Sequence, residues 1–355
     1  MARWELKPSQ ASASAAPDFT LQGFGASALG GEGQTVFHVT NRNDTGAGSF
    51  RSLVEGGASN MYIVFDVGGN FDIDPIRIGG HHITIDGSTA PSPGVTFREY
   101  GISFENDSGV TAHHIVVKNI RHSGPITHSV AFADVDNFSV TESAHDIAFH
   151  KVSSRNASDG CLDITDNAYN VTVQWSIIAK QEQASDSASG ASLLKYGEKN
   201  ITVHHCIFNT DERGPLAGFQ EDDVSETTDT TADIVNNINW KWVAHAIAVD
   251  GGAHANVKNC WFQKSGAYGS DTVEISPFFA LAKAYINGCI AANGYNVDAL
   301  RNVSSPYTAP SVTTDSVADA VANVLAYAGC RGDSFGLDAA DQAIVDDITN
   351  NGNLP

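Results

Sequence analysis

The chain is poor in positive charge. It has 20 lysine and arginine residues against 41 aspartate and glutamate residues, which gives a formal charge of −21 over 355 residues. Proteins that bind nucleic acid or an anionic membrane need a basic surface, so this balance argues against both kinds of partner. An anionic substrate is compatible with the charge only if a local cation offsets the field.

Long apolar runs and cysteine pairs are also missing. No stretch approaches the ~18 consecutive apolar residues of a membrane span. The five cysteines include no CxxC pair, which excludes a disulfide scaffold and a zinc ribbon, and their odd number leaves at least one free thiol. No signal peptide is visible in Met1–Phe19. We expect residues 1–20 to be a mobile tail and residues 21–355 to be a single domain.

Short β-branched runs, by contrast, recur through the whole chain. Successive runs are 22 to 33 residues apart, and most begin with a polar residue, as at His82, His114, Asp146, Asn170 and Asn200. Such a period indicates a solenoid or a propeller, but propeller blades need ~40–50 residues. The pattern therefore predicts an all-β parallel β-helix, in which each coil consists of three short strands and three bends.

Stacking of the coils can be predicted from one buried column. The alignment matches four buried apolar residues of successive coils, Val203, Val235, Val257 and Ile286. Three positions after each of them it predicts an inward column of Cys206, Ile238, Cys260 and Cys289. The same alignment places Asn237 above Asn259 at a bend. A disulfide between Cys260 and Cys289 is possible in distance, although in-register parallel neighbours have poor geometry for one.

Helical patterns occur near both ends. A short helix is expected near Arg51–Glu55, where it would help to cap the coil. Near the C-terminus, Asp315 is the expected N-cap of a helix whose apolar stripe runs from Val317 to Ala328. A second helix is expected to begin at Asp338 and to end at residues 350–352. We expect both C-terminal helices to pack along the coil.

Acidic residues gather at one place in the repeat. Asp159 and Asp163 are four residues apart, on a turn and then a strand, and stacking brings Asp136 of the preceding coil near them. Carboxylates that converge in this way can bind calcium, which takes 6–8 oxygen ligands. The alternative is a set of solvated turn aspartates. Arg213, held before Gly-Pro one to two coils further on, could bind a carboxylate beside such a site.

These residues carry a resemblance to a known family. The relevant segments are Gly23-Phe-Gly-Ala, Val39-Thr-Asn-Arg-Asn-Asp-Thr-Gly-Ala-Gly-Ser-Phe-Arg51, Ile83-Thr-Ile-Asp-Gly-Ser, Asp159-Gly-Cys-Leu-Asp-Ile, Asn170-Val-Thr-Val-Gln-Trp-Ser and Thr202-Val-His-His-Cys-Ile-Phe. In this order, over roughly residues 22–350, the chain resembles the pectate lyases of polysaccharide lyase family one.

The resemblance implies a right-handed parallel β-helix that cleaves polygalacturonate by calcium-assisted β-elimination. It implies that Asp136, Asp159 and Asp163 are calcium ligands and that Arg213 is the catalytic arginine. Leu216 stands where the family has a second arginine. Gln183 falls where a substrate-binding lysine is usual, which leaves Lys180 and Lys195 as the candidates.

Taken together, these features predict a secreted, monomeric pectate lyase whose partner is an anionic uronate polysaccharide. Two alternatives stay open. One is a β-helical polysaccharide hydrolase, which would use two or three carboxylates and no calcium. The other is a non-catalytic carbohydrate-binding or virion β-helix, which is favoured by the missing signal peptide and by the loss of the second arginine.

Overall fold

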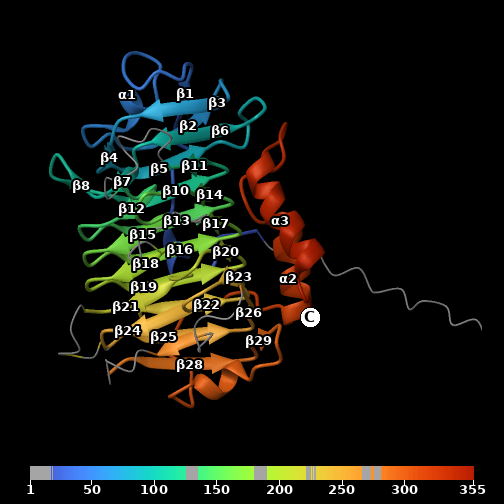
Figure 1. Cartoon of the computed structure of the whole chain (residues 1–355). Helices are drawn as coiled ribbons and strands as arrows, with labels where there is room; N and C mark the ends of the chain where they lie inside the picture. Colours follow the sequence, from blue (N-terminus) through green and yellow to red (C-terminus); the bar gives the residue numbers. More distant parts are fainter. Residues whose placement is uncertain are drawn as a thin grey trace, which may run out of the picture.

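A computed structural model of the chain describes residues 17, 19–124, 135–179, 190–220, 225, 227, 229–265, 273–275 and 281–355. Within these residues the strands form three large parallel sheets, here called A, B and C, and one small antiparallel pair, β8 (Asn106–Asp107) with β9 (Val110–Thr111). Figure 1 shows the strands as the rungs of one stack that runs from the blue N-terminal coils to the orange C-terminal ones. The predicted parallel β-helix is confirmed.

The chain visits the three sheets in turn, so each coil adds one strand to each. Sheet A consists of β1 (Thr35–Val39), β2 (Met61–Phe65), β5 (His81–Asp86), β10 (His113–Lys118), β13 (His145–His150), β16 (Tyr169–Gln174), β19 (Lys199–His204), β22 (Ala232–Val235), β25 (His254–Lys258) and β28 (Lys283–Asn287). Sheet B consists of β3 (Gly69–Ile73), β6 (Val95–Glu99), β11 (Arg121–Ser123), β14 (Ser153–Arg155), β17 (Ile177–Ala179), β20 (Ile207–Asn209), β23 (Ile238–Trp242), β26 (Trp261–Lys264) and β29 (Ile290–Ala291). Sheet C consists of β4 (Ile76–Ile78), β7 (Ile102–Phe104), β12 (Phe138–Val140), β15 (Leu162–Thr165), β18 (Leu193–Lys195), β21 (Leu216–Gly218), β24 (Ile247–Asp250) and β27 (Val273–Ile275).

The β-branched runs form strands because equivalent residues of successive coils stack on one another. In sheet A one inward column is fully buried and consists of Ile83, Ile115, Ile147, Val171 and Ile201. Strands in a sheet lie about 4.8 Å apart, so these branched side chains contact their neighbours above and below. This repetition makes the core continuous along the whole stack.

The polar residue that opens each run has a conformational role. His82, His114, Asp146, Asn170 and Asn200 all adopt the left-handed region, with φ between 52° and 58°. Asn, Asp and His tolerate this region better than other residues that carry a side chain. A polar residue therefore recurs at the start of these runs because each one forms the sharp bend that leads into sheet A.

The predicted cysteine column is wrong by one residue in one coil. Val203 pairs with Ile234 and not with Val235, so the residue stacked on Cys206 is Asn237, whose side-chain oxygen accepts a hydrogen bond from the Cys206 N–H at 2.8 Å. Ile238 instead belongs to β23 and pairs with Ile207. All five cysteines are free, so Cys260 and Cys289 are not bridged.

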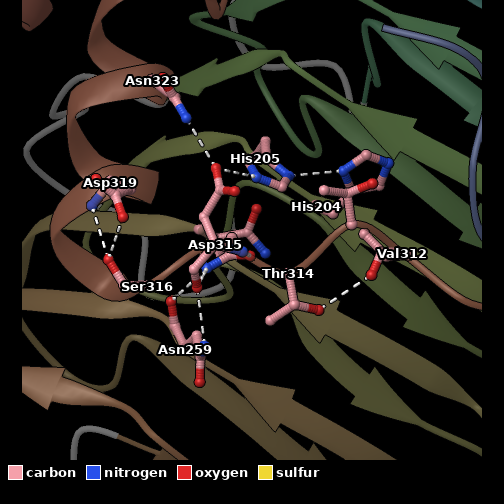
Figure 2. A network of polar contacts seen from close by, with 12 residues as sticks. His204, His205, Asn259, Val312, Thr314, Asp315, Ser316, Asp319 and Asn323 are labelled. Carbon is pink, nitrogen blue, oxygen red and sulfur yellow. Dashed lines mark hydrogen bonds and ion pairs between the residues drawn. The ribbon is translucent and has the colours of Figure 1, made fainter. Parts of the chain in front are cut away.

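The asparagine pair at the bend shifts with the register. Asn237 is buried in the core, and the residue beside Asn259 is Asn236, whose amide donates to the Asn259 carbonyl at 3.1 Å. Both Asn236 and Asn259 are left-handed, with φ of 54° and 50°. Both amides also donate to the backbone carbonyl of Asp315, at 3.0 and 2.9 Å, and thereby attach the C-terminal segment to the coil (Figure 2).

Helices close the N-terminal end and cover sheet B. The short helix α1 (Arg51–Val54) lies at the top of Figure 1, as expected. Helices α2 (Val317–Tyr327) and α3 (Ala339–Asn351) run along the side of the stack. Their apolar faces pack on the outer side of sheet B, in a cluster that includes Ile177, Trp240 and Trp261. The two predicted C-terminal helices are confirmed. The described residues also include two short 3₁₀ turns, η1 (Phe24–Ser27) and η2 (Val297–Leu300).

One helix cap differs from the prediction. Ser316, and not Asp315, caps α2, because the Ser316 hydroxyl accepts the Asp319 N–H. The Asp315 carboxylate is used elsewhere: it accepts the Asn323 amide at 2.8 Å and lies 3.4 Å from His205 Nε2 (Figure 2). Asp338 does cap α3, where it accepts the N–H groups of Ala340 and Asp341.

The N-terminal segment packs on sheet A. Residues 24 and 25 of η1 donate N–H bonds to Thr202 and Thr172, which lie on β19 and β16. Helices thus cover sheet B and the N-terminal segment covers part of sheet A, whereas β12, β15 and β18 of sheet C carry polar side chains on their outer face. Within the described residues no helix has the length and apolar character needed to cross a membrane.

Candidate active site

Asp163 lies at the centre of the outer face of sheet C. On β15 the side chains of Leu162 and Ile164 point into the core, so Asp163 between them points outward. It is nevertheless only 6% exposed, and its Oδ1 accepts the Leu193 N–H at 2.9 Å. Gly160 makes this position possible, because a Cβ there would lie about 2.2 Å from the Asp163 carboxylate.

Asp136 and Asp159 stand beside Asp163, as the stacking predicted. Asp136 precedes β12, and its Oδ1 accepts the Gly160 N–H at 2.9 Å. The Asp159 N–H donates to the Val135 carbonyl at 3.2 Å, which fixes the two turns against each other. Burial, together with the negative charges of Asp136 and Asp159, raises the pKa of Asp163 well above its ordinary value. The three carboxylates are therefore close enough to repel one another.

The carboxylate oxygens of these three aspartates are suitable ligands for a hard divalent cation. Mutual repulsion among carboxylates is relieved when a cation binds between them, and calcium prefers carboxylate oxygens. Two of the oxygens, Asp136 Oδ1 and Asp163 Oδ1, already accept backbone hydrogen bonds. Within the described part of the chain, no three His, Cys, Asp or Glu side chains are grouped tightly enough to enclose a metal ion. A cation would thus need the carboxylates to close slightly and would need further ligands from water or substrate.

Arg213 lies two coils beyond Asp163, directly before β21. Its carbonyl accepts the Ser192 N–H at 3.0 Å, and its backbone is left-handed with φ of 54°. The arginine packs over Gly190, where a Cβ would lie 2.2 Å from the Arg213 Cβ. Its side chain is 25% exposed, so the guanidinium stays accessible. The positive charge of Arg213 opposes the upward shift of the Asp163 pKa, so the two side chains are close enough to interact electrostatically.

Of the two candidate lysines, the described structure contains one. Lys195 is on β18, and its Nζ lies 3.3 Å from Asp250 Oδ2 on β24. Lys180 lies outside the described residues, as does Gln183. Leu216 pairs with Leu193 in sheet C and is only 9% exposed. An apolar contact therefore occupies the position of the missing second arginine.

Two further acids, which no motif of the sequence indicated, lie near Lys195. Burial raises the pKa of Asp250, and the positive charges of Lys195, Arg213 and His245 oppose that shift. Glu198 is fully buried, its two carboxylate oxygens have no hydrogen-bond partner among the described residues, and burial raises its pKa well above its ordinary value. Asp250 could have been found by following the column from Lys195 across Gly218. No sequence signal marks Glu198.

A hollow extends the same face toward the N-terminal coils. A cavity of about 250 Å³ lies beside Asp136 and is lined by residues of β4, β7, β12 and the turns next to them, among them Arg77, Tyr100 and Glu105. Arg77 lies 3.3 Å from Glu105 and its side chain is 71% exposed. The outer face of sheet C thus offers a polar surface that is longer than the acidic cluster itself.

Comparison with known proteins gives relatives of one kind. No protein-family model matches the chain. A protein of Aspergillus terreus named probable pectate lyase C is 29% identical over 279 residues, which cover 78% of this chain and 60% of that protein. The protein of the same name from Aspergillus fumigatus strain Af293 is 29% identical over 332 residues, which cover 87% of this chain and 71% of that protein. The chain thus spans about 60% of the length of the A. terreus protein.

Solved structures with the same fold agree. The major allergen from cedar pollen superimposes with a TM-score of 0.63 at 18% identity, covering 87% of this chain and 92% of the allergen. A pectate lyase from Bacillus sp. N165 in complex with trigalacturonate gives a TM-score of 0.55 at 18% identity, covering 87% and 98% of the two chains. These matches confirm the β-helical fold, and the curated relatives confirm the resemblance that the sequence motifs indicated.

Proposed function

We propose that this homologue of the pectate lyases cleaves polygalacturonate by β-elimination, with calcium bound between enzyme and substrate. One observation carries the proposal: Asp136, Asp159 and Asp163 meet on the outer face of sheet C, within the electrostatic reach of Arg213. A uronate polymer is anionic, so a chain with a formal charge of −21 can bind it only where cations offset the repulsion.

Asp136, Asp159 and Asp163 are the residues that would hold calcium. A calcium ion held there would supply positive charge that stabilises negative charge developing on a substrate carboxylate. The raised pKa of Asp163 supports this assignment, because a buried carboxylate beside two others is ionised more easily when a cation is near. The remaining ligands would come from substrate and water.

Arg213 is the proposed catalytic residue. In the elimination, hydroxide from the solvent takes the C5 proton from the position next to the uronate carboxylate, and the electron pair of that C–H bond forms the C4–C5 double bond. The C4–O bond breaks at the same time, and the leaving oxygen takes a proton from water. Negative charge develops on the carboxylate as the proton leaves, and a guanidinium at that point stabilises it. The 25% exposure of the Arg213 side chain and its position over Gly190, after the bend before β21, support this role.

Lys195 is the proposed substrate-binding lysine. It projects from the same face as Asp163, one coil nearer to Arg213. Leu216 is uncharged, so fewer basic side chains would contact the substrate than in the family pattern. A secreted location and a monomeric state, both expected from the sequence, are part of this proposal.

A lyase assay tests the proposal directly. Purified protein is mixed with polygalacturonate, and the ultraviolet absorbance of the new double bond is followed with calcium and with EDTA. We expect absorbance to rise only with calcium. Release of reducing ends without that absorbance would indicate a hydrolase, and the absence of both would leave a carbohydrate-binding protein.

A further inference from the structure

Lys195 and Asp250 meet across an intervening strand. Lys195 is on β18 and Asp250 is on β24, with β21 between them. The register places Gly218 of β21 opposite both residues, since Leu194 pairs with Ala217 and Gly218 pairs with Asp250. Strands two apart are separated by about 9.6 Å, so two side chains can make contact over the middle strand only if it offers no side chain of its own.

Gly218 provides that space. A Cβ at this position would lie 2.3 Å from Asp250 Oδ1 and 3.0 Å from Lys195 Cγ. The lysine stem therefore crosses directly above the glycine, and its Nζ reaches Asp250 Oδ2 at 3.3 Å. Both side chains are 13% exposed, so this ion pair is held within the wall of the site and is not a loose surface contact.

The charges around the pair explain why it forms. Asp250 is also influenced by the positive charges of Arg213 and His245, so one carboxylate lies among three basic side chains. Without it, Lys195 and Arg213 would repel each other when no substrate is present. Glu198 is buried close by, and burial raises its pKa well above its ordinary value, whereas the ion pair with Lys195 is formed by Asp250.

We propose that Asp250 is a positioning residue that holds Lys195 across Gly218 at the place where Lys195 binds the substrate carboxylate. This inference rests on the proposed function. It assigns Asp250 no contact with the substrate. Its effect passes through the lysine, because a long flexible side chain that is fixed in advance loses less entropy when the substrate binds.

Four variants test the inference. Asp250→Ala removes the partner, Asp250→Asn keeps an acceptor oxygen in place, Gly218→Ala forces the pair apart while both charges stay, and Asp347→Asn is the control. Asp347 forms a 2.7 Å pair with Lys241 at helix α3, on the covered side of the stack. Steady-state lyase kinetics on polygalacturonate with saturating calcium are measured for each, and circular dichroism checks that each variant is folded.

We expect Asp250→Ala and Gly218→Ala to lower kcat/KM by about 10- to 100-fold, the effect of misplacing a binding group by about 1 Å. Asp250→Asn keeps an acceptor oxygen but loses the charge, so its activity should lie between those of wild type and Asp250→Ala, and the control should match wild type. In a Lys195→Ala background, Asp250→Ala should add almost nothing, because residues that act through one another are not additive.

Three results would overturn the inference. The first is wild-type kinetics in both folded Asp250→Ala and folded Gly218→Ala. The second is a folded Asp250→Asn enzyme more impaired than Asp250→Ala, because an acceptor oxygen at that place should hold the lysine at least as well as no side chain. The third is full additivity with Lys195→Ala. If Asp250→Ala does not fold, Gly218→Ala decides. Wild-type protein without lyase activity would instead refute the proposed function, and this inference with it.

Discussion

Replacing Asp163 by Asn should remove the response to calcium while leaving the fold intact. Asn has nearly the same shape, and its side-chain oxygen can still accept the Leu193 N–H that Asp163 Oδ1 accepts at 2.9 Å. What is lost is one of three mutually repelling charges. The pKa of Asp163 in the folded protein lies well above its ordinary value. Between these two pKa values the folded protein therefore keeps a proton on Asp163 that the unfolded chain has already released. The native state therefore loses stability as pH rises from the ordinary range of Asp through the raised value.

The expected magnitude follows from the ligands. Three carboxylates offer six oxygens, and two of these, Asp136 Oδ1 and Asp163 Oδ1, accept backbone hydrogen bonds. The substitution removes one carboxylate oxygen together with a full charge, and we expect at least about 100-fold weaker calcium binding, or about 2.7 kcal/mol. At calcium 100 times the wild-type Kd, the wild type gains about 2.7 kcal/mol and the variant about 0.4 kcal/mol.

Thermal unfolding with calcium and with EDTA measures this difference. The wild type should show a rise in Tm of roughly 5 °C, and Asp163→Asn a rise close to zero. Asp166→Asn, at an exposed bend three residues further on, changes net charge equally and should keep the full rise. At neutral pH without calcium, Asp163→Asn should be more stable than wild type, because the repulsion is gone. An undiminished calcium response in Asp163→Asn, or a calcium-free variant less stable than wild type, would refute the reasoning.

Three further outcomes follow from the structure. Arg213→Ala should lower kcat for polygalacturonate by about 100-fold or more in the absorbance assay, and calcium-induced stabilisation should survive. Glu198→Gln should become increasingly more stable than wild type as pH rises above 4.5. The folded-state pKa of Glu198 is raised, so the wild type loses stability as that carboxyl ionises. Equal stabilities of the two proteins at all pH values would contradict this. Asp338→Ala breaks both 2.7 Å bonds to Arg155 and uncaps α3, so urea unfolding should show a loss of about 3–5 kcal/mol.

The fold could be predicted because each coil repeats the same local rules. A polar residue tolerant of left-handed φ, then a β-branched strand, recurs often enough for the period to be visible in one sequence. The C-terminal helices were predictable from their apolar stripes and, for α3, from the Asp338 cap. The cap of α2 was not, because Asp315 and Ser316 are both good capping residues and only tertiary contacts decide between them. Asp315 is drawn instead to His205 and Asn323.

The acidic half of the site could be predicted because its members lie on adjacent coils. Asp159 and Asp163 are four residues apart and Asp136 lies about one repeat before them, so stacking alone brings the three together. The second half is harder. Asp250 lies 87 residues after Asp163, and its contact with Lys195 depends on the register of the strands between them and on the missing side chain of Gly218. A pattern of hydrophobic residues carries no information about such a gap.

The one-residue error in the column shows why register was the limiting step. Ile234 and Val235 are both apolar, and both Asn236 and Asn237 can adopt left-handed φ, so two alignments satisfy the pattern equally. Hydrophobicity favours the wrong one, because it buries Ile238 in the column in place of Asn237. The structure buries Asn237 at no cost in unpaired groups: its amide donates to the Val203 carbonyl at 2.9 Å, and its oxygen accepts the Cys206 N–H at 2.8 Å. An asparagine is thus as compatible with this core as an aliphatic residue when its side chain bonds the backbone groups at the bend. Only the hydrogen bonds of those backbone groups distinguish the two registers.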